Sequence, residues 1–159
     1  MNLDEHFLNI AVEEARKASW PFGAVLVKGD EIVSQAGSGD GQDESYDPTA
    51  HAEVNAIRRA CHSLGTGDLT GMTLYASCEP CALCVGAAWY AGIKKIVYGT
   101  SLEDIKEINQ VWGGDLAFPH DQLDATGIDM RDGILKEEVM NMYVAHPKIK
   151  SIGDRDGSK

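Results

Sequence analysis

The first helix is predicted from the spacing of apolar residues at the start of the chain. Apolar residues recur there every three or four positions, with acidic residues between them. They are Leu3, Phe7, Ile10, Ala11 and Ala15. Because this is the period of an amphipathic helix, residues 3–18 should form one and pack its apolar face on a sheet.

Short apolar runs separated by turn residues predict the strands of that sheet. The runs 22–27 and 31–34 flank a Lys-Gly-Asp turn, which is typical of a hairpin with glycine in the turn. Further strands are expected at 73–76, at 94–99 and, more briefly, at 128–130. The sheet should therefore have about five strands.

Two helices are predicted between these strands. Asp47 and Thr49 offer capping oxygens and Pro48 suits a first turn, so one helix should begin there and run to about Cys61. Proline at position 80 should open a second helix that continues to about Tyr90. This alternation of strands and helices predicts an α/β fold with helices on both faces of the sheet.

The remaining segments carry weaker patterns. Residues 102–109 and 134–144 have helical apolar spacing, whereas 111–125 look irregular. The segment 36–47 holds three glycines and several acids, so we expect an exposed loop, either a solvated surface or a gate above the site. Residues 151–159 are polar and should form a frayed tail of a single domain spanning 1–159.

Charge and cysteine content narrow the function classes. With 14 Lys plus Arg against 25 Asp plus Glu, the formal net charge is -11, which disfavours binding to nucleic acid. The four cysteines crowd between positions 61 and 84, which is typical of a metal or redox site in a reducing compartment. The sequence lacks an export signal and any apolar run of roughly 20 residues. We therefore expect a cytoplasmic protein without a membrane partner.

Three residues at two predicted helix starts have the chemistry of zinc ligands. His51 offers an imidazole, and Cys81 and Cys84 offer two thiolates three positions apart. Structural zinc sites usually close with four protein ligands, whereas catalytic sites use three and keep one position for water. The alternative is a closed structural site with Cys61 or Cys78 as fourth ligand, but these two cysteines are better explained as buried core residues.

Glu53 has the place of a proton carrier. It lies two residues after His51, so on a helix the two side chains point in different directions and need not both bind the metal. Zinc lowers the pKa of water toward about 7, and a neighbouring carboxylate can pass the proton to a departing amine. The pattern His-x-Glu with Pro-Cys-x-x-Cys is the signature of zinc-dependent deaminases. The sequence therefore predicts hydrolytic deamination.

From about Trp20 to Thr100 the chain resembles the cytidine deaminase-like superfamily. The resemblance lies in the segments 21–25, 47–58 and 74–87, and it is greatest to bacterial guanine deaminases within the branch that also holds tRNA adenosine deaminases and yeast-type cytosine deaminase. It implies a three-layer α/β/α sandwich with a mixed central sheet, bound Zn2+, and a homodimer. It also implies that a small heterocyclic base and water are the reactants.

The resemblance also marks candidate substrate contacts. They are Phe22, Ala24, Ser38, Ala52, Ser77, Glu79, Trp89 and Asp115. Ser38 stands where relatives usually have an asparagine that grips the base, and a hydroxyl is shorter than an amide and cannot offer its donor and acceptor together. Asp115 could accept hydrogen bonds from ring N–H or amino groups, and Trp112 could stack on the base or close the pocket.

Several functions remain open from the sequence. The base could be guanine, cytosine, an isocytosine-like base or an aminotriazine. The alternative enzyme is a tRNA-specific adenosine deaminase, which would need a basic surface; a local patch, for instance of Arg58, Arg59, Lys94 and Lys95, could supply one. A catalytically dead zinc-binding subunit is the third possibility, and the presence of Glu53 argues against it. His6, His62, His120 and His146 have no partner spacing and are expected to be surface or satisfied histidines.

Overall fold

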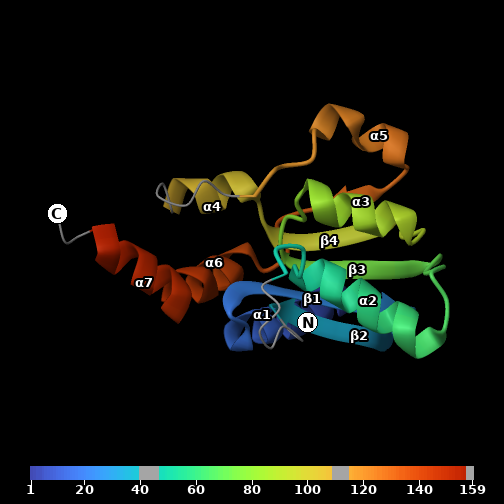
Figure 1. Cartoon of the computed structure of the whole chain (residues 1–159), viewed down its shortest axis with the longest axis horizontal. Coiled ribbons are helices and arrows are strands. Elements are labelled where there is room, and N and C mark those ends of the chain that lie inside the picture. The colour runs from blue at the N-terminus through green and yellow to red at the C-terminus, as the bar shows by residue number, and fades with distance from the viewer. Residues whose placement is uncertain (40–46, 109–114, 157–159) are drawn as a thin grey trace.

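A five-stranded mixed sheet forms the centre of the protein (Figure 1). The computed structural model describes residues 1–39, 47–108 and 115–156, with side chains as far as residue 152. The strand order is β2-β1-β3-β4-β5; β1 is antiparallel to both its neighbours, and the pairs β3–β4 and β4–β5 are parallel. The strands are β1 (Trp20–Lys28), β2 (Glu31–Ser38), β3 (Met72–Cys78), β4 (Lys95–Thr100) and β5 (Asp129–Arg131).

Helices cover both faces of this sheet. They are α1 (Leu3–Lys17), α2 (Ala52–Leu64), α3 (Ala82–Tyr90), α4 (Leu102–Ile108), the short 3-10 turn η1 (His120–Gln122), α5 (Leu123–Thr126), α6 (Lys136–Ala145) and α7 (Pro147–Asp156). Helices α6 and α7 lead away from the sheet toward the C-terminus (Figure 1). Among the described residues, no helix is both long and apolar enough to cross a bilayer.

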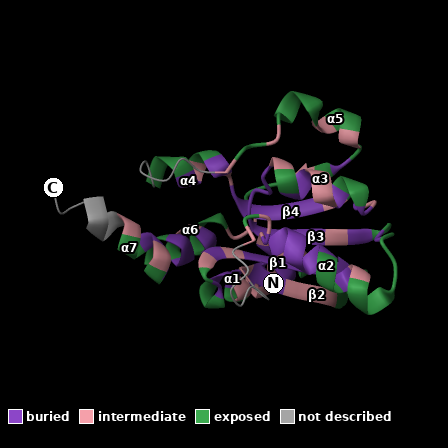
Figure 2. Ribbon diagram, in the orientation of Figure 1, coloured by how far each residue is buried: buried purple, intermediate pink, exposed green. Residues whose placement is uncertain are grey.

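Alternate side chains of each strand fill two separate cores, as expected for a sheet buried on both faces. On one face, Ala24 and Leu26 of β1 pack with residues of α2 and α3. On the other face, Val25 and Val27 pack with α1. Helix α6 extends this second layer, because its buried residues contact α1 and the end of β3. Figure 2 shows the resulting purple, buried interior of the strands. The predicted α/β/α sandwich with a mixed sheet is confirmed.

Local chemistry explains where the first elements begin and turn. The side chain of Asn2 accepts a hydrogen bond from the Glu5 amide, and the Glu5 carboxylate accepts one from the Asn2 amide, which is a capping box at the start of α1. The β1–β2 hairpin turns at Gly29 with a φ of 64°. At Gly23 a side chain would overlap the Ala11 carbonyl oxygen and lie 2.5 Å from the Ala15 nitrogen, so α1 packs directly on the backbone of β1.

Three predicted segments differ from the structure. Residues 36–38 belong to β2 rather than to a loop, because Ala36 and Gly37 pair with β1. Residues 120–125 of the supposedly irregular segment form η1 and most of α5. The tail expected from Ser151 is helical as far as Asp156. Residues 40–46 and 109–114, which include Trp112 and most of the predicted gate, lie outside the described residues.

The helices after the two proline-containing turns begin later than predicted. Helix α2 begins at Ala52 instead of Pro48, because the Asp47 carboxylate accepts hydrogen bonds from the amide and hydroxyl of Thr49 and caps a turn rather than the helix. Helix α3 begins at Ala82 instead of Pro80. The consequence is that a metal-type ligand occupies the N-cap position of each helix.

Candidate metal centre and substrate pocket

Two helix N-termini bring the three metal-type ligands together. His51 is the N-cap residue of α2, Cys81 is the N-cap residue of α3, and Cys84 lies in the first turn of α3. Both N-cap residues have extended backbone conformations, and neither side chain caps its own helix. Their side chains are therefore available at the positive ends of two helix dipoles, where anionic sulfur is favoured.

The ligand atoms already have the spacing that a zinc ion requires. The Sγ atoms of Cys81 and Cys84 are 3.6 Å apart, and each lies 3.5 Å from Nδ1 of His51. A tetrahedral ion with zinc–sulfur bonds of about 2.3 Å and zinc–nitrogen bonds of about 2.0 Å holds two sulfurs about 3.8 Å apart and sulfur and nitrogen about 3.5 Å apart. The donor set therefore fits zinc without rearrangement of the backbone.

The electrostatics of the cluster favour a thiolate at Cys81. The hydrogen bond with Cys84, followed by the contact with His51, lowers the pKa of the Cys81 thiol to about 4. The hydrogen bond with Cys81 and burial raise the pKa of Cys84 well above that of a free thiol. A bound metal ion would displace the protons of these hydrogen-bonded thiols, because metal ligands must be deprotonated.

Neither of the other two cysteines joins this cluster. Among the residues that the structure describes, the group with metal-ligand spacing consists of His51, Cys81 and Cys84. Cys78 is buried against α1 and α6, and burial raises the pKa of its thiol. Cys61 packs at the edge of the other core. With three protein ligands, the site has the composition of a catalytic rather than a structural zinc site.

Glu53 lies beside the ligands in the first turn of α2. Its carboxylate oxygen Oε2 is 3.4 Å from Sγ of Cys84, and the residue is only 6% exposed. Burial raises the pKa of Glu53 to about 7. A carboxyl group with a pKa near neutrality can both accept and return a proton at physiological pH, which is the property of a general acid–base group.

A cavity of about 230 Å³ opens in front of this cluster. Its lining combines metal-type ligands with aromatic side chains from β1, small residues from the end of β2, and acidic side chains from four other positions in the chain. The lining residues are Trp20, Phe22, Ser38, Gly39, Asp47, Pro48, Ala50, His51, Glu53, Glu79, Cys81 and Asp115. The cavity is smaller than pockets for drug-sized ligands, which span about 300 to 1,000 Å³.

Comparison with known families agrees with this geometry. Residues 1–100 match the family model described as the cytidine and deoxycytidylate deaminase zinc-binding region. The chain belongs to this family. The match covers both ligand motifs, so zinc is the cofactor that the family and the positions of His51, Cys81 and Cys84 indicate together.

Two relatives of this chain are named for different substrates. The chain is 43% identical to guanine deaminase of Bacillus subtilis over 65% of its own length and 63% of that protein. It is 42% identical to the tRNA-specific adenosine deaminase of Aquifex aeolicus over 59% of its length and 64% of that protein. The chain thus covers less than two thirds of the length of these curated relatives.

A solved structure from a study of A-to-I editing by tRNA:A34 deaminases supports the fold over a longer range. It superimposes with a TM-score of 0.65 and 30% identity, covering 86% of this chain and 98% of the other. The likeness therefore extends beyond residues 1–100 into the second half of this deaminase-family chain.

The structure brings some of the candidate substrate residues to the cavity and leaves others away from it. Phe22, Ser38, Glu79 and Asp115 line the cavity together with metal-type ligands and Glu53. Three others are fully buried, namely Ala24, Ala52 and Ser77. The Ser77 hydroxyl accepts a hydrogen bond from the Gly23 amide. Trp89 lines a separate, largely apolar cavity together with Phe118.

Several lining residues escaped the sequence-based prediction. Trp20 is the largest of them, and the pairing of β1 with β2 is irregular between Trp20 and Gly23. Pro21 was the available signal, because proline within a strand usually marks a bulge or an edge, and bulges redirect side chains near functional sites.

Asn55 was also missed. Its buried amide donates hydrogen bonds to the carbonyl oxygens of Gly37 and Ala50, which ties β2 to the turn before His51.

Two of the remaining histidines have partners that spacing alone could not reveal. His146 is buried, and its Nε2 lies 3.0 Å from the Ala18 carbonyl oxygen. His120 is largely exposed, as predicted, yet its Nε2 lies 2.6 Å from Oε1 of the buried Glu79. Glu79 and His120 are 41 residues apart, so only the folded chain brings them together.

Proposed function

We propose that this protein is a zinc-dependent hydrolytic deaminase of a free nucleobase or a related amino-substituted heterocycle. The observation that carries the proposal is the arrangement of three zinc-type ligands, His51, Cys81 and Cys84, with the buried Glu53 carboxylate beside them at one end of a small cavity. In the reaction, water replaces the amino group of the base, and an oxo-substituted base and ammonia are released.

Each residue of the cluster has a defined task in this reaction. The zinc held by the three ligands would supply a water of lowered pKa as nucleophile. Glu53 accepts the proton of that water at a carboxylate oxygen and delivers it to the leaving amino group. The pKa of about 7 that burial gives Glu53 allows both transfers at neutral pH. Burial also keeps bulk water away from the carboxylate.

The size of the cavity supports a free base as substrate. A volume of about 230 Å³ suits one small planar ring system. Trp20 and Phe22 provide aromatic surface against which such a ring can stack. Ser38 and Asp115 provide polar groups at the wall; Asp115 is a half-buried carboxylate whose pKa is raised by burial. It would accept hydrogen bonds from N–H groups of the base.

Charge also favours a free base over a polyanionic substrate. Among the residues that the structure describes, the carboxylates of Asp47, Glu79 and Asp115 line the cavity besides Glu53, and neither a lysine nor an arginine does. The guanidinium of Arg58 lies 3.3 Å from the Asp47 carboxylate, and that of Arg59 donates to the Gln35 carbonyl oxygen. The hint of a basic patch is weakened at Arg58, because the Asp47 carboxylate offsets its charge.

The second candidate is a tRNA-specific adenosine deaminase. The relatives at 42% identity and the structural match that spans 98% of a tRNA deaminase chain favour it. Against it stand the net charge of -11 and the acidic lining of the cavity, which repel a phosphate backbone.

A substrate screen by ammonia release tests both candidates. Guanine, cytosine, isocytosine, adenine, aminotriazines, the matching nucleosides and an adenosine-containing tRNA anticodon stem-loop would be offered to the purified zinc-loaded protein. We expect release from at least one free base and none from the stem-loop. Release from the stem-loop alone would make the tRNA candidate correct.

The variant Glu53→Gln is the matched control for chemistry, because it keeps the shape of the side chain but cannot carry the proton. We expect kcat on the active base to fall by roughly 100- to 10,000-fold while zinc content stays unchanged. Full turnover in this variant would disprove the role of Glu53. If the wild-type protein releases no ammonia from any substrate, a dead zinc-binding subunit becomes the better explanation.

A further inference from the structure

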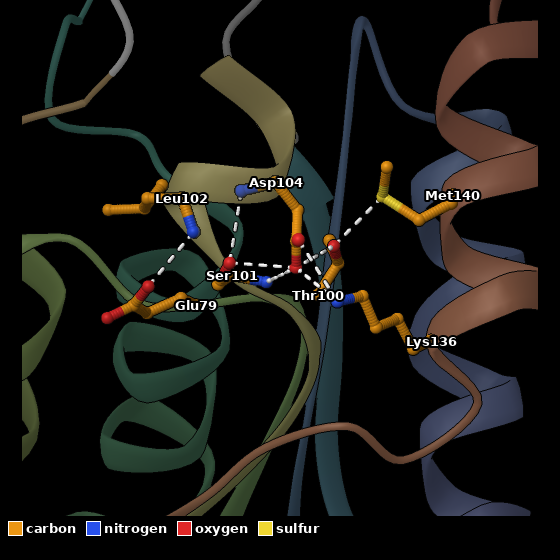
Figure 3. Close-up of polar contacts among 7 residues, drawn as sticks. All are labelled: Glu79, Thr100, Ser101, Leu102, Asp104, Lys136 and Met140. Carbon is orange, nitrogen blue, oxygen red and sulfur yellow. Dashed lines mark hydrogen bonds and ion pairs between the residues drawn. The ribbon is translucent and has the colours of Figure 1, made fainter. Parts of the chain in front are cut away.

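Both oxygens of the buried Glu79 carboxylate are bonded to the chain at the edge of the cavity. Its side chain is 6% exposed. Oε2 accepts a hydrogen bond of 2.9 Å from the Leu102 amide at the start of α4, as Figure 3 shows. Oε1 lies 2.6 Å from Nε2 of His120. Each oxygen thus has a partner in another segment, so Glu79 connects three segments of the chain.

The segment that His120 belongs to reaches the cavity at Asp115. We call residues 115–122 the wall segment; Asp115 at its start lines the cavity, and η1 at its end carries His120. Between residues 115 and 119 it has no regular secondary structure. Such a segment needs contacts from its side chains and carbonyl groups to keep one position.

Two contacts attach the wall segment to the turn that carries Cys81. The Leu116 carbonyl oxygen accepts a 2.7 Å hydrogen bond from the Ala82 amide. His120 is bonded to Glu79. These two attachment points flank Cys81 in the sequence, so the wall segment is joined directly to the metal-binding turn.

The other side of Glu79 is held independently. Ser101 and Asp104 form a capping box at the start of α4, in which the Asp104 amide donates to the Ser101 hydroxyl and the Asp104 carboxylate accepts from the Ser101 amide. Lys136 of α6 forms an ion pair with the same carboxylate at 2.9 Å (Figure 3). The Leu102 amide is thereby fixed, so Glu79 keeps its orientation through this bond, and His120 is its only contact with the wall segment among the described polar interactions.

We propose that His120 is a positioning residue: its hydrogen bond to the buried Glu79 holds the wall segment, and with it Asp115, against the cavity. The bond does not need a charged imidazole, because a neutral ring with its proton on Nε2 donates to the carboxylate as well. The role of Asp115 as a contact of the base rests on the proposed function. The attachment of the wall segment does not, and it can be measured without any substrate.

Hydrogen–deuterium exchange on the full-length, zinc-loaded protein tests the attachment. His120→Ala removes the donor, whereas His120→Gln places an amide N–H near the position of Nε2. The control is Lys94→Ala, which removes the hydrogen bond from Lys94 Nζ to the Thr126 carbonyl oxygen farther along the same stretch of chain. We expect His120→Ala to increase exchange of the 115–122 peptide and of the Ala82 amide by about tenfold, the scale of one lost hydrogen bond to a charged group.

The other two variants show whether the effect is specific to the hydrogen bond of His120. His120→Gln should return exchange close to the wild-type rate, and Lys94→Ala should leave the 115–122 peptide unchanged. If His120→Ala exchanges like the wild type, or if His120→Gln is as impaired as His120→Ala, the proposal is wrong. Equal loosening in His120→Ala and Lys94→Ala would also overturn it, because it would indicate a general effect on the stretch 115–128.

A kinetic measurement connects the attachment to substrate binding. On the base found active in the screen, His120→Ala should raise KM by about tenfold with a smaller change in kcat and unchanged zinc content, since Asp115 loses its position while Glu53 does not. An unchanged KM alongside increased exchange would refute the connection to Asp115. If no base is turned over by the wild-type protein, the proposed function fails, and the exchange data still decide the attachment.

Discussion

The metal cluster and the rest of the cavity lining, which we call the wall, are built in different ways. His51, Cys81 and Cys84 come from the first turns of α2 and α3, two helices that pack on the central sheet and on each other. The wall comes from the irregular end of β1, the end of β2 and the wall segment, with Trp20, Ser38 and Asp115 as its main side chains. The cluster thus lies on packed helix ends, whereas the wall comes from strand ends and from a segment without regular structure.

The difference indicates that the reaction and the choice of substrate depend on different parts of the molecule. Ligands on packed helix ends keep a spacing that suits zinc whatever base is present. Side chains on strand ends and on a segment without regular structure can change with less effect on the core. The family resemblance is therefore stronger evidence for the type of reaction than for the identity of the base.

The strongest way to break the cluster is to remove one ligand. Cys84→Ala should lower zinc affinity by more than about a hundredfold, because even the partners of metal ligands contribute 10- to 100-fold. It should also abolish the gain in thermal stability that zinc gives the wild-type protein. Zinc titration and melting curves measure both effects. Cys61→Ala, a cysteine outside the cluster, is the control and should bind zinc normally; equal losses in the two variants would contradict the ligand assignment.

The wall is tested by removing its largest aromatic side chain. Trp20 lines the cavity, and Nζ of Lys148 in α7 lies 4.5 Å from the centre of its ring. Trp20→Ala should raise KM for the active base by about tenfold, the scale of one base stacked on an aromatic ring, and should leave zinc binding unchanged. Steady-state kinetics measure this, with Tyr90→Ala, an exposed aromatic residue, as the control. Loss of zinc in Trp20→Ala would show that wall and cluster are not separable.

The smallest expected effect concerns the support behind Glu79. The hydrogen bond from Lys136, followed by those from Ser101, lowers the pKa of Asp104 to about 2. A carboxyl whose pKa is lower in the folded than in the unfolded chain stabilises the fold above its unfolded pKa of about 4 and loses this contribution as the pH falls toward 2. Because the pair is partly exposed, Asp104→Asn should cost about 1 kcal/mol at pH 7.

Denaturant unfolding of the wild type and Asp104→Asn at several pH values checks this prediction. The difference in free energy of unfolding should be constant from pH 7 to about 5 and shrink below about pH 4. A difference that persists unchanged to pH 3 would mean that the ion pair with Lys136 is not its source. Zinc content should be equal in both proteins throughout.

The metal cluster could be predicted from the sequence because its information is local. Cys81 and Cys84 are one helical turn apart, and Glu53 follows His51 by two residues, so spacing alone suggested their roles. The layers of the fold were predictable for the same reason, since the apolar periods of α1 and of β1 are properties of short stretches.

Contacts between distant segments could not be predicted in this way. The glycines and acids of 36–47 indicated a loop, yet β1 offered residues 36–38 a partner strand, and pairing outweighed composition. Asp47 looked like a helix cap, but its carboxylate is used by Thr49 in a turn. The bond between Glu79 and His120 spans 41 residues and leaves no pattern in either segment.

The close packing of α1 on β1 at Gly23 decides how this pocket could be redesigned. Position 23 tolerates no side chain, because a methyl group there would overlap the backbone of α1. Its amide also donates to the Ser77 hydroxyl one residue before Cys78. A library that randomises residues 20, 22 and 38 while keeping Gly23 should therefore yield folded, zinc-binding variants with altered base preference, whereas one that includes position 23 should yield mostly insoluble protein.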